Sequence, residues 1–494
     1  MIAFDKPINP LRKLKKMTRK SLAAFALAQI FGAMTLIAPP ALAQFDGAVY
    51  TQTNADAANA IAAFGRNPNG TLRFIGNYRT GGQGSTEFDG DEGLDPLISA
   101  DSIVVTDDQR FLITVNAGSD TVTSFRINSN FSLRRVSTVR SGGVGPNSIA
   151  VRGNLVFVSN IDRDGLALGV AETTRGEPND EGNIVGFSID GNGRLRQVRG
   201  GVINLDNRPA DVGFSSNGRF LIVSSITAGS AALPGPNAEN SIAVYGVQPN
   251  GRVTGLRGSA TSTEVGNEEG RNLPSAIDFD TTVIDGREFV VVTEAREFNS
   301  VGAPPILPAL QAGSVSVYQL NRNGSLRTVA ADVAIGDPLG SPFDPNNQLT
   351  SCWIDFGNDG RTFYVSNAIN ATISSFYLEG SGNPRLLRAE AASGTSGFAN
   401  GGTTGPEVFG TTDGFIDLDV TDDGRFLYQL EGLSGAISAY AVGRNGSLRR
   451  VGRNVGNLPE IDTQGLITVS SPRNRLQALL LAFLIKLKLA LGLL

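Results

Sequence analysis

Short hydrophobic segments alternate with turn residues along most of the chain. In residues 415–451, four segments rich in β-branched and aromatic side chains are separated by Asp-Asp-Gly and Asn-Gly turns. These turns supply the positive φ angles that tight antiparallel hairpins need. Similar segments flank the turns at Asn217-Gly, Asn250-Gly and Asp359-Gly. Each unit of this kind predicts one four-stranded antiparallel sheet.

A Leu-Arg pair near the end of each unit gives the period of the repeat. Successive pairs are 61 or 62 residues apart, with one interval of 70. WD40 repeats of about 40 to 45 residues and kelch repeats of about 50 are shorter. The pattern predicts an all-β, seven-bladed β-propeller of four-stranded antiparallel blades. The pairs begin at Leu72, Leu133, Leu195, Leu256, Leu326, Leu387 and Leu448.

The first unit lacks its first strand. Residues 48–51, 61–64 and 72–75 supply only three β-type segments, whereas residues 465–470 follow the seventh unit and have the character of a first strand. We expect this C-terminal segment to complete the first blade, which would close the ring and remove its open edge.

The first 43 residues do not fit the repeat. A basic stretch precedes an apolar run at residues 22–37 and a small-residue site at Ala41-Leu-Ala. This order is typical of a secretory signal peptide, and a cytosolic amphipathic helix is the alternative. We therefore expect a mature chain that starts at Gln44 and is periplasmic or extracellular, with a propeller over residues 44–471.

The C-terminal residues 472–494 form a separate apolar tail, which we expect to be helical. Residues 476–494 are almost wholly apolar and are interrupted chiefly by Gln477, Lys486 and Lys488. The length is near the lower limit for a bilayer span, but the two lysines point to opposite sides of a helix. Membrane association, docking on the propeller and an unstructured tail all remain open.

Composition excludes several kinds of chemistry. The chain has no histidine, which removes Ser-His-Asp catalysis and imidazole metal sites. Cys352 is the only cysteine, so no intramolecular disulfide forms. The net charge of −5 argues against a general nucleic-acid surface. Acidic loops at residues 87–95 and 177–181 match no EF-hand spacing, and solvated charge is favoured over calcium. We predict a monomer without metal or cofactor.

Long loops point to one face as the place for a small-molecule, protein or glycan ligand. In an up-and-down blade, the second-to-third loops and the links between blades share one face, and here these are the expanded ones. The second strands end at this face with polar residues, which could contact a ligand or satisfy loop backbone groups. They are Asn54, Asn116, Asn160, Ser225, Glu294, Asn367 and Glu431.

Proline-containing segments precede three of the first strands, at residues 146–149, 209–212 and 274–277. Arg208 and Asp211 flank one of them, and Arg271 precedes another. Arginines fixed near the centre of the ring could bind an anionic or carbonyl-bearing ligand. Ordinary Arg-Asp pairing between blades is the alternative interpretation.

The chain resembles the lactonase-type seven-bladed propellers, which include phosphogluconolactonase and carboxymuconate cyclases. The resemblance rests on Asp423-Gly-Arg-Phe-Leu-Tyr, Asn217-Gly-Arg-Phe-Leu-Ile and Asp359-Gly-Arg-Thr-Phe-Tyr, with the segments that follow them. It covers nearly all of residues 44–470. These motifs are structural turns, so they support the fold strongly and the reaction weakly.

The resemblance implies that a lactone is opened or closed. An arginine, Arg296 or Arg271, would then polarise the carbonyl, and Glu294 would handle the proton. Members with this activity carry histidine near the proline-containing segments, where this chain has Ser148, Asp211 and Ala276. A non-catalytic propeller that binds a protein or glycan through its loop face is the alternative function.

Overall fold

The computed structural model describes residues 45–471 except for 86–94, 98, 162–181, 206–207, 227–240, 261–274, 296–311, 338–346 and 395–413. The predicted signal peptide, the apolar tail and most of the long loops therefore lie outside the described residues.

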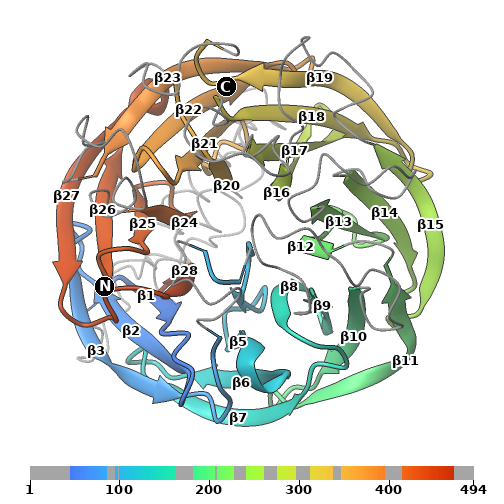
Figure 1. Cartoon of the computed structure of the whole chain (residues 1–494), viewed down its shortest axis with the longest axis vertical. Helices are drawn as coiled ribbons and strands as arrows, with labels where there is room; N and C mark the ends of the chain where they lie inside the picture. The colour runs from blue at the N-terminus through green and yellow to red at the C-terminus, as the bar shows by residue number, and fades with distance from the viewer. Residues whose placement is uncertain are drawn as a thin grey trace, which may run out of the picture. The chain divides into compact units, whose positions relative to one another are not determined.

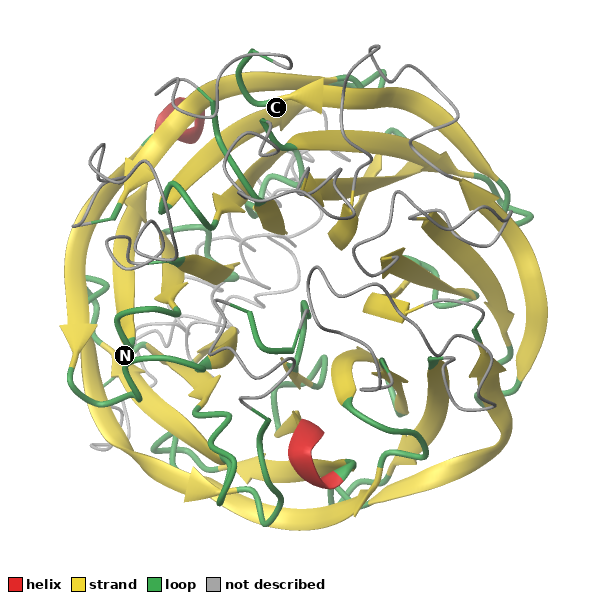
Figure 2. Cartoon of the chain, viewed as in Figure 1, coloured by secondary structure: helices red, strands yellow, loops and turns green. Residues whose placement is uncertain are grey.

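Seven four-stranded antiparallel sheets surround a central axis, as predicted (Figure 1). The chain is built almost entirely of strands, and the helices that are drawn are single short turns (Figure 2). From the axis outward the sheets are β28(Gln464–Ser470), β1(Gly47–Gln52), β2(Ala60–Arg66), β3(Leu72–Arg79); β4(Ile103–Val105), β5(Phe111–Asn116), β6(Thr121–Ile127), β7(Leu133–Arg140); β8(Pro146–Arg152), β9(Leu155–Asn160), β10(Asn183–Ile189), β11(Leu195–Asn204); β12(Arg208–Phe214), β13(Phe220–Ile226), β14(Ser241–Val247), β15(Val253–Ala260); β16(Ser275–Ile284), β17(Arg287–Ala295), β18(Ser314–Leu320), β19(Leu326–Ala334); β20(Ser351–Phe356), β21(Thr362–Asn367), β22(Thr372–Leu378), β23(Pro384–Ser393); and β24(Phe415–Val420), β25(Phe426–Glu431), β26(Ala436–Val442), β27(Leu448–Val455).

The predicted closure of the ring is confirmed. Strand β28 pairs antiparallel with β1, so that Leu466 lies opposite Thr51 and Thr468 lies opposite Val49. The first blade thus combines the two ends of the described chain. Both edges of β1 are therefore paired, and the first blade has four strands like the other six.

The hydrophobic core lies between neighbouring sheets rather than within one of them. One cluster joins Ile113 and Val115 of the second sheet to Val156 and Val158 of the third, and all four side chains are fully buried. The second strands pack on both faces, so β5 and β25 are buried at every position. Packing on both faces explains why these strands read as continuous hydrophobic runs.

The Leu-Arg pairs mark the outermost strand of every sheet, but in two sheets their register differs. Five pairs start the strand, as Leu133 does opposite Ile127. In the fourth and sixth sheets, the strand instead starts at Val253 opposite Val247 and at Pro384 opposite Leu378. Leu256 and Leu387 thus lie three residues further along their strands, so the regular spacing there is only approximate.

Candidate functional site

Glu294, the predicted proton-handling residue, lies at the end of β17 and is 1% exposed. Its two carboxylate oxygens accept hydrogen bonds from Ser314 and Ser316 of β18, each at 2.7 Å. These bonds give Glu294 a structural function between the second and third strands of its sheet. Arg296 and Arg271, its predicted partners, lie outside the described residues.

Glu431 occupies the same position in the seventh sheet and has stronger partners. Its buried carboxylate accepts hydrogen bonds from Ser438 at 2.6 Å and Ser434 at 2.8 Å. The Arg453 guanidinium adds a bidentate ion pair, with Nε 2.8 Å from Oε2. A charge-assisted pair of this geometry compensates the cost of burying the carboxylate.

Three of the four predicted amides also bond to the third strand of their own sheets. Asn116 donates to Thr123 at 3.0 Å, Asn160 to the Asn183 side chain at 2.8 Å, and Asn367 to Ser374 at 2.8 Å. Asn54 instead donates to the Ser85 carbonyl at 2.7 Å, so the bridge between second and third strands recurs in most sheets but not in the first. This geometry supports the structural interpretation of these positions.

Arg208 and Asp211 both lie on β12, the innermost strand of the fourth sheet, and both are buried. Of the site residues predicted from the sequence, Asp211 is the one that the structure brings together with other ionisable groups. It belongs to a set of aspartates on or beside the innermost strands, which we call the axial carboxylates. They are Asp101, Asp211, Asp278, Asp280, Asp355, Asp417 and Asp419.

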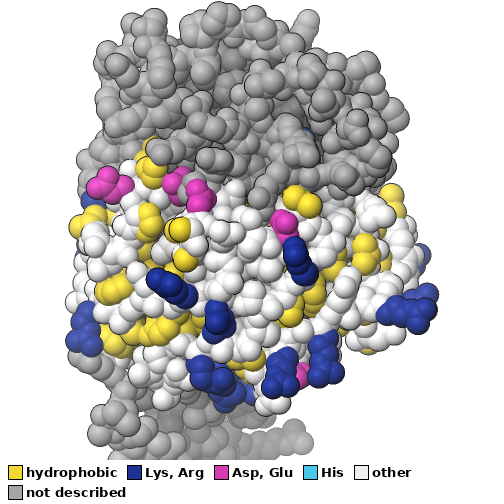
Figure 3. Space-filling view, turned by 60° about the horizontal axis from the view of Figure 1, so that its bottom comes forward, with side chains coloured by type: hydrophobic (Ala, Val, Ile, Leu, Met, Phe, Trp, Pro, Cys, Tyr) yellow, Lys and Arg dark blue, Asp and Glu magenta, His cyan; other side chains and the backbone are white. Residues whose placement is uncertain are grey.

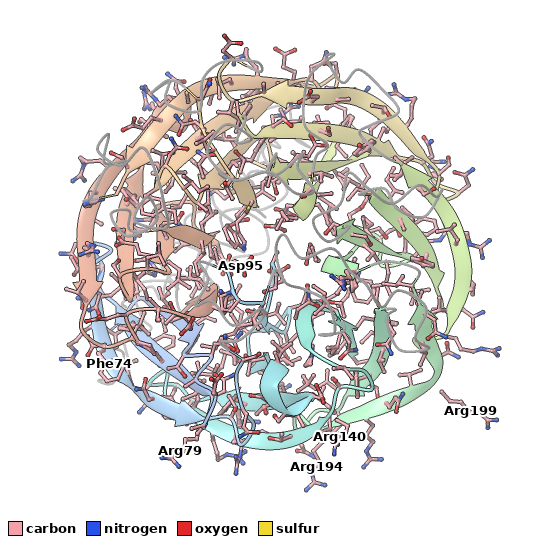
Figure 4. The ribbon with its side chains drawn as sticks, viewed as in Figure 1. Phe74, Arg79, Asp95, Arg140, Arg194 and Arg199 are labelled. Atoms are coloured by element: carbon pink, nitrogen blue, oxygen red, sulfur yellow. The ribbon has the colours of Figure 1, made fainter. Side chains whose placement is uncertain are left out.

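The axial carboxylates come from different blades but lie near one another. The charges of Asp211, Asp417 and Asp280, which belong to three sheets, all raise the pKa of Asp101. Asp95 lies beside them near the axis (Figure 4), and its charge raises the pKa of Asp417. Within the described part of the chain, no axial carboxylate forms an ion pair with an arginine.

Several axial carboxylates satisfy backbone groups of the next blade. Asp278 accepts a hydrogen bond from the Ile354 N–H at 2.9 Å, and Asp417 accepts one from the Leu466 N–H at 2.7 Å. Asp355 does the same for Val420 at 2.6 Å. The inner edge of an innermost strand has no neighbouring strand, so these side chains supply acceptors that the sheet lacks.

Asp211 and Asp278 form a pair between the fourth and fifth sheets. Asp211 Oδ1 accepts hydrogen bonds from Ser148 Oγ and from the Val212 N–H, both at 2.7 Å. Asp211 Oδ2 is buried and has no N–H or O–H partner among the donors of the described structure. The charge of Asp211 raises the pKa of Asp278, so ionisation of one carboxyl group disfavours ionisation of the other.

Burial keeps the axial carboxylates protonated far above the usual range for aspartate. Burial raises the pKa of Asp211 to about 7, although hydrogen bonds from Ser148 and Val212 lower it. It raises the pKa of Asp419 to about 7 and that of Asp280 to about 6. The pKa values of Asp101, Asp278, Asp355 and Asp417 are also raised, chiefly by burial. Among the described residues of a chain without histidine, Asp211, Asp419 and Asp280 are the groups whose pKa is raised to between about 6 and about 7.

Asp101 is the exposed member of the set. It precedes β4 and adopts a left-handed backbone with φ of 55°. Protein surrounds it closely enough to raise its pKa, yet its side chain still meets solvent. An accessible carboxyl with a raised pKa can act as a general acid.

Apolar residues pack beside the axial carboxylates. Trp353, the only tryptophan, is buried on β20 and donates its Nε1–H to the Ser99 carbonyl at 2.9 Å. The same cluster contains Ala100, Ala210 and Ile277. The segment before β4 therefore reaches from the second sheet to the sixth, and it holds Asp101 among the other carboxylates.

The described residues contain neither a metal site nor a membrane-spanning helix. No group of three or more Cys, Asp or Glu side chains there has the arrangement of a metal site. In that same part of the chain, no helix is long and apolar enough to cross a membrane.

Solved structures confirm the lactonase-type fold. No family model and no curated protein matches the sequence. A periplasmic gluconolactonase of Pseudomonas aeruginosa is 17% identical, with a TM-score of 0.53 over 86% of this chain and 99% of its own. A candidate 6-phosphogluconolactonase of Bacteroides fragilis is 15% identical, with a TM-score of 0.51 over 87% and 100%. A Lactobacillus plantarum protein is 15% identical, with a TM-score of 0.56 over 86% and 99%. Identities this low show the fold alone.

Sequence reasoning missed six of the seven axial carboxylates. The signal was present in Ile277-Asp-Phe-Asp and Ile416-Asp-Leu-Asp, where aspartates alternate with apolar residues in an innermost strand. Alternate residues of a strand point to the same side. Because innermost strands are mostly buried, an acidic residue at every second position is unusual and indicates a specific function.

Proposed function

We propose that this protein is an exported lactonase-like hydrolase that opens a small organic-acid lactone close to the axial carboxylates. The observation that carries the proposal is Asp101, an accessible carboxyl with a raised pKa, beside the Asp211–Asp278 pair. Two of the structures with this fold are described as a gluconolactonase and a candidate 6-phosphogluconolactonase, which supports the same class of reaction.

In the proposed reaction, water attacks the lactone carbonyl and the bond to the ring oxygen breaks. Asp101, whose pKa is raised by burial, donates its proton to the departing ring oxygen and regains one from the attacking water. The products are the open hydroxy acid and an unchanged enzyme. Arg271 or Arg296 would polarise the carbonyl, as the family resemblance implies. Glu294 is less suited to proton transfer because two serine hydroxyls hold its carboxylate.

The concentration of carboxyl groups near the axis favours an uncharged lactone. The axial carboxylates outnumber the described basic groups near them. Arg208, on the innermost strand β12, is the described arginine close to Asp211. A phosphate group on the substrate would be repelled by any carboxylates that are ionised. We therefore propose a neutral sugar lactone or a similar uncharged lactone as the substrate.

Hydrolysis of glucono-δ-lactone by the full chain, followed in a pH-stat with the uncatalysed rate subtracted, tests this proposal. Asp101→Asn should lower kcat at least a hundredfold, because the amide cannot donate a proton to the leaving oxygen. Asp285→Asn is the matched control, since Asp285 also has a positive φ, of 51°, but lies in an exposed turn. Equal rates for the two variants, or no turnover by the unmodified protein, would reject the lactonase proposal and favour a binding function.

Export is part of the proposal and rests on the sequence of residues 1–43. Mass spectrometry of the protein from fractionated cells gives a direct test. A mature chain that begins at Gln44 in the periplasmic or culture fraction is expected. A chain that retains Met1 and remains in the cytosol would contradict export without affecting the lactonase proposal.

A further inference from the structure

Exposed arginines occupy equivalent positions on the outermost strands of six sheets. Each follows the first paired residue of its strand, so Arg134 lies opposite Arg126 just after the Leu133–Ile127 pair. In an up-and-down blade, this end of the outermost strand adjoins the third-to-fourth turn, on the face opposite the long loops. The six residues are Arg73, Arg134, Arg196, Arg327, Arg385 and Arg449, and all are exposed.

The fourth sheet reaches the same arrangement by a different residue. Thr254 occupies the equivalent position, one residue after the Val253–Val247 pair. The Arg257 guanidinium extends back to this place and donates from Nη2 to Thr254 Oγ1 at 2.9 Å. All seven blades therefore place a guanidinium at this rim. We call the six arginines and Arg257 the guanidinium ring.

A second set of arginines on the same face is bonded to carbonyl groups and carboxylates of the propeller itself. Arg110 follows a first-to-second turn, donates to the Gly191 carbonyl at 2.8 Å and lies 3.4 Å from Asp108. Arg425 similarly donates to the Pro68 carbonyl and pairs with Asp423 at 3.9 Å. These arginines fasten one blade to the next, and their charge is balanced by neighbouring carboxylates.

The guanidinium ring has little such compensation. Among the described residues, Arg134, Arg196, Arg257, Arg327 and Arg449 form no ion pair, and Arg385 pairs with the exposed Glu379 at 3.7 Å. In Figure 3, basic side chains gather along the lower part of the described surface, whereas acidic ones are few there. Five of the seven arginines thus form no ion pair within the described structure, and the ring forms a positive rim on a chain whose net charge is −5.

The identity of the basic residues points to phosphate as the ligand group. Residues 45–471 contain no lysine, so every basic side chain of the propeller is an arginine. A guanidinium binds phosphate oxygens through two parallel hydrogen bonds, which an ammonium group cannot do. Charges more than about 8 Å away are largely screened at physiological salt. The local ring therefore determines this interaction, and the net charge does not.

We propose that the guanidinium ring docks the propeller onto an anionic phospholipid bilayer. The ring members are distributed over all seven sheets around the axis, so only a planar array of phosphates meets many of them at once. A phosphopeptide or a short oligonucleotide would reach two or three neighbouring blades. This inference is independent of the proposed lactonase activity, since it uses the opposite face and none of the axial carboxylates.

Vesicle flotation of the full chain tests the inference. Vesicles of phosphatidylglycerol and phosphatidylcholine should carry the protein upward at low salt, and 0.5 M salt should release it. Arg134→Gln/Arg449→Gln should weaken binding about 30-fold, at roughly tenfold or less for each removed charge near the surface. The matched control is Arg79→Gln/Arg140→Gln, because these exposed arginines lie at the other end of their strands and point outward (Figure 4). The control should bind as the unmodified chain does.

Three results would overturn the inference. Equal loss in both double variants would show general attraction by surface charge. Salt-resistant binding to phosphatidylcholine alone would show that the apolar tail, residues 476–494, carries the interaction. Retention on immobilised polyphosphate without flotation on phosphatidylglycerol vesicles would assign the ring to a soluble polyanion instead of a bilayer.

Discussion

Asp211 raises the pKa of Asp278 across the boundary between the fourth and fifth blades, because the negative charge of one buried carboxylate disfavours ionisation of the other. Each carboxylate also accepts a backbone hydrogen bond, from Val212 and Ile354 respectively. The pair therefore links protonation to the packing of neighbouring blades. Its consequence is that the stability of the propeller depends on pH in a window where most proteins show little change.

We predict that the propeller loses stability as the pH rises from about 4 to about 7. The pKa of Asp211 and that of Asp419 are raised to about 7, and that of Asp280 to about 6, whereas an unfolded aspartate titrates near 3.9. The folded state binds more protons than the unfolded state in this window, so unfolding becomes easier with rising pH, by on the order of 1 kcal/mol per pH unit for each group. Urea unfolding at pH 5 and pH 8, followed by the fluorescence of Trp353, measures the difference.

Asp211→Asn should flatten part of this pH dependence. The amide keeps an acceptor for Ser148 and removes the charge that raises the pKa of Asp278, which would then ionise more easily. The expected result is a smaller difference in unfolding free energy between pH 5 and pH 8. Asp285→Asn, in an exposed turn, should leave the difference unchanged. An unaltered slope in Asp211→Asn would contradict the raised pKa of Asp211.

We also predict that removing β28 opens the ring. A chain that ends at Ser471 retains β28 and should unfold cooperatively, as the unmodified propeller does. A chain that ends at Asp462 leaves β1 with one unpaired edge and should aggregate or lose at least 10 °C in Tm, because an exposed edge strand pairs with other chains. Size-exclusion chromatography and thermal unfolding distinguish these outcomes. Equal Tm values for the two truncated chains would show that β28 is dispensable.

The architecture could be predicted from the sequence because it depends on local chemistry that recurs. Turns such as Asp423-Gly and Asn217-Gly require positive φ, with Gly424 at 65° and Gly218 at 69°, and such positions are readable without a structure. The register of the outermost strands was less certain. In the fourth and sixth sheets Val253 and Pro384 occupy the position that leucine has in the other five, and a Leu-Arg pair three residues later happens to keep nearly the same spacing.

The candidate site could be predicted only in part, because its residues come from different blades and meet only when the propeller closes. Asp211 was found from its position beside a proline-containing segment. Asp101, Asp355 and Asp419 lie far apart in sequence, and only closure of the propeller brings them together. The function of Glu294 is likewise decided by serines of the next strand. The predicted arginines Arg271 and Arg296 remain predictions.

Glu294 and Glu431 occupy equivalent positions, but we expect substitutions at the two sites to differ in their effect on stability. Glu294 is held by two serine hydroxyls, whereas Glu431 also forms a bidentate pair with Arg453. Glu294→Gln preserves an acceptor and a similar shape, so it should lower the free energy of unfolding by no more than about 1 kcal/mol and keep lactone hydrolysis within threefold.

Arg453→Ala should be more damaging because it leaves the fully buried Glu431 carboxylate without its counter-charge. Removing one partner of a buried pair costs about 3 to 5 kcal/mol, and the partial exposure of Arg453 places this case toward the lower end. Urea unfolding of both variants gives the two values, and the double variant Glu431→Gln/Arg453→Ala should recover part of the loss. If Glu294→Gln instead abolished hydrolysis with stability intact, Glu294 would be the proton-handling residue and Asp101 would not.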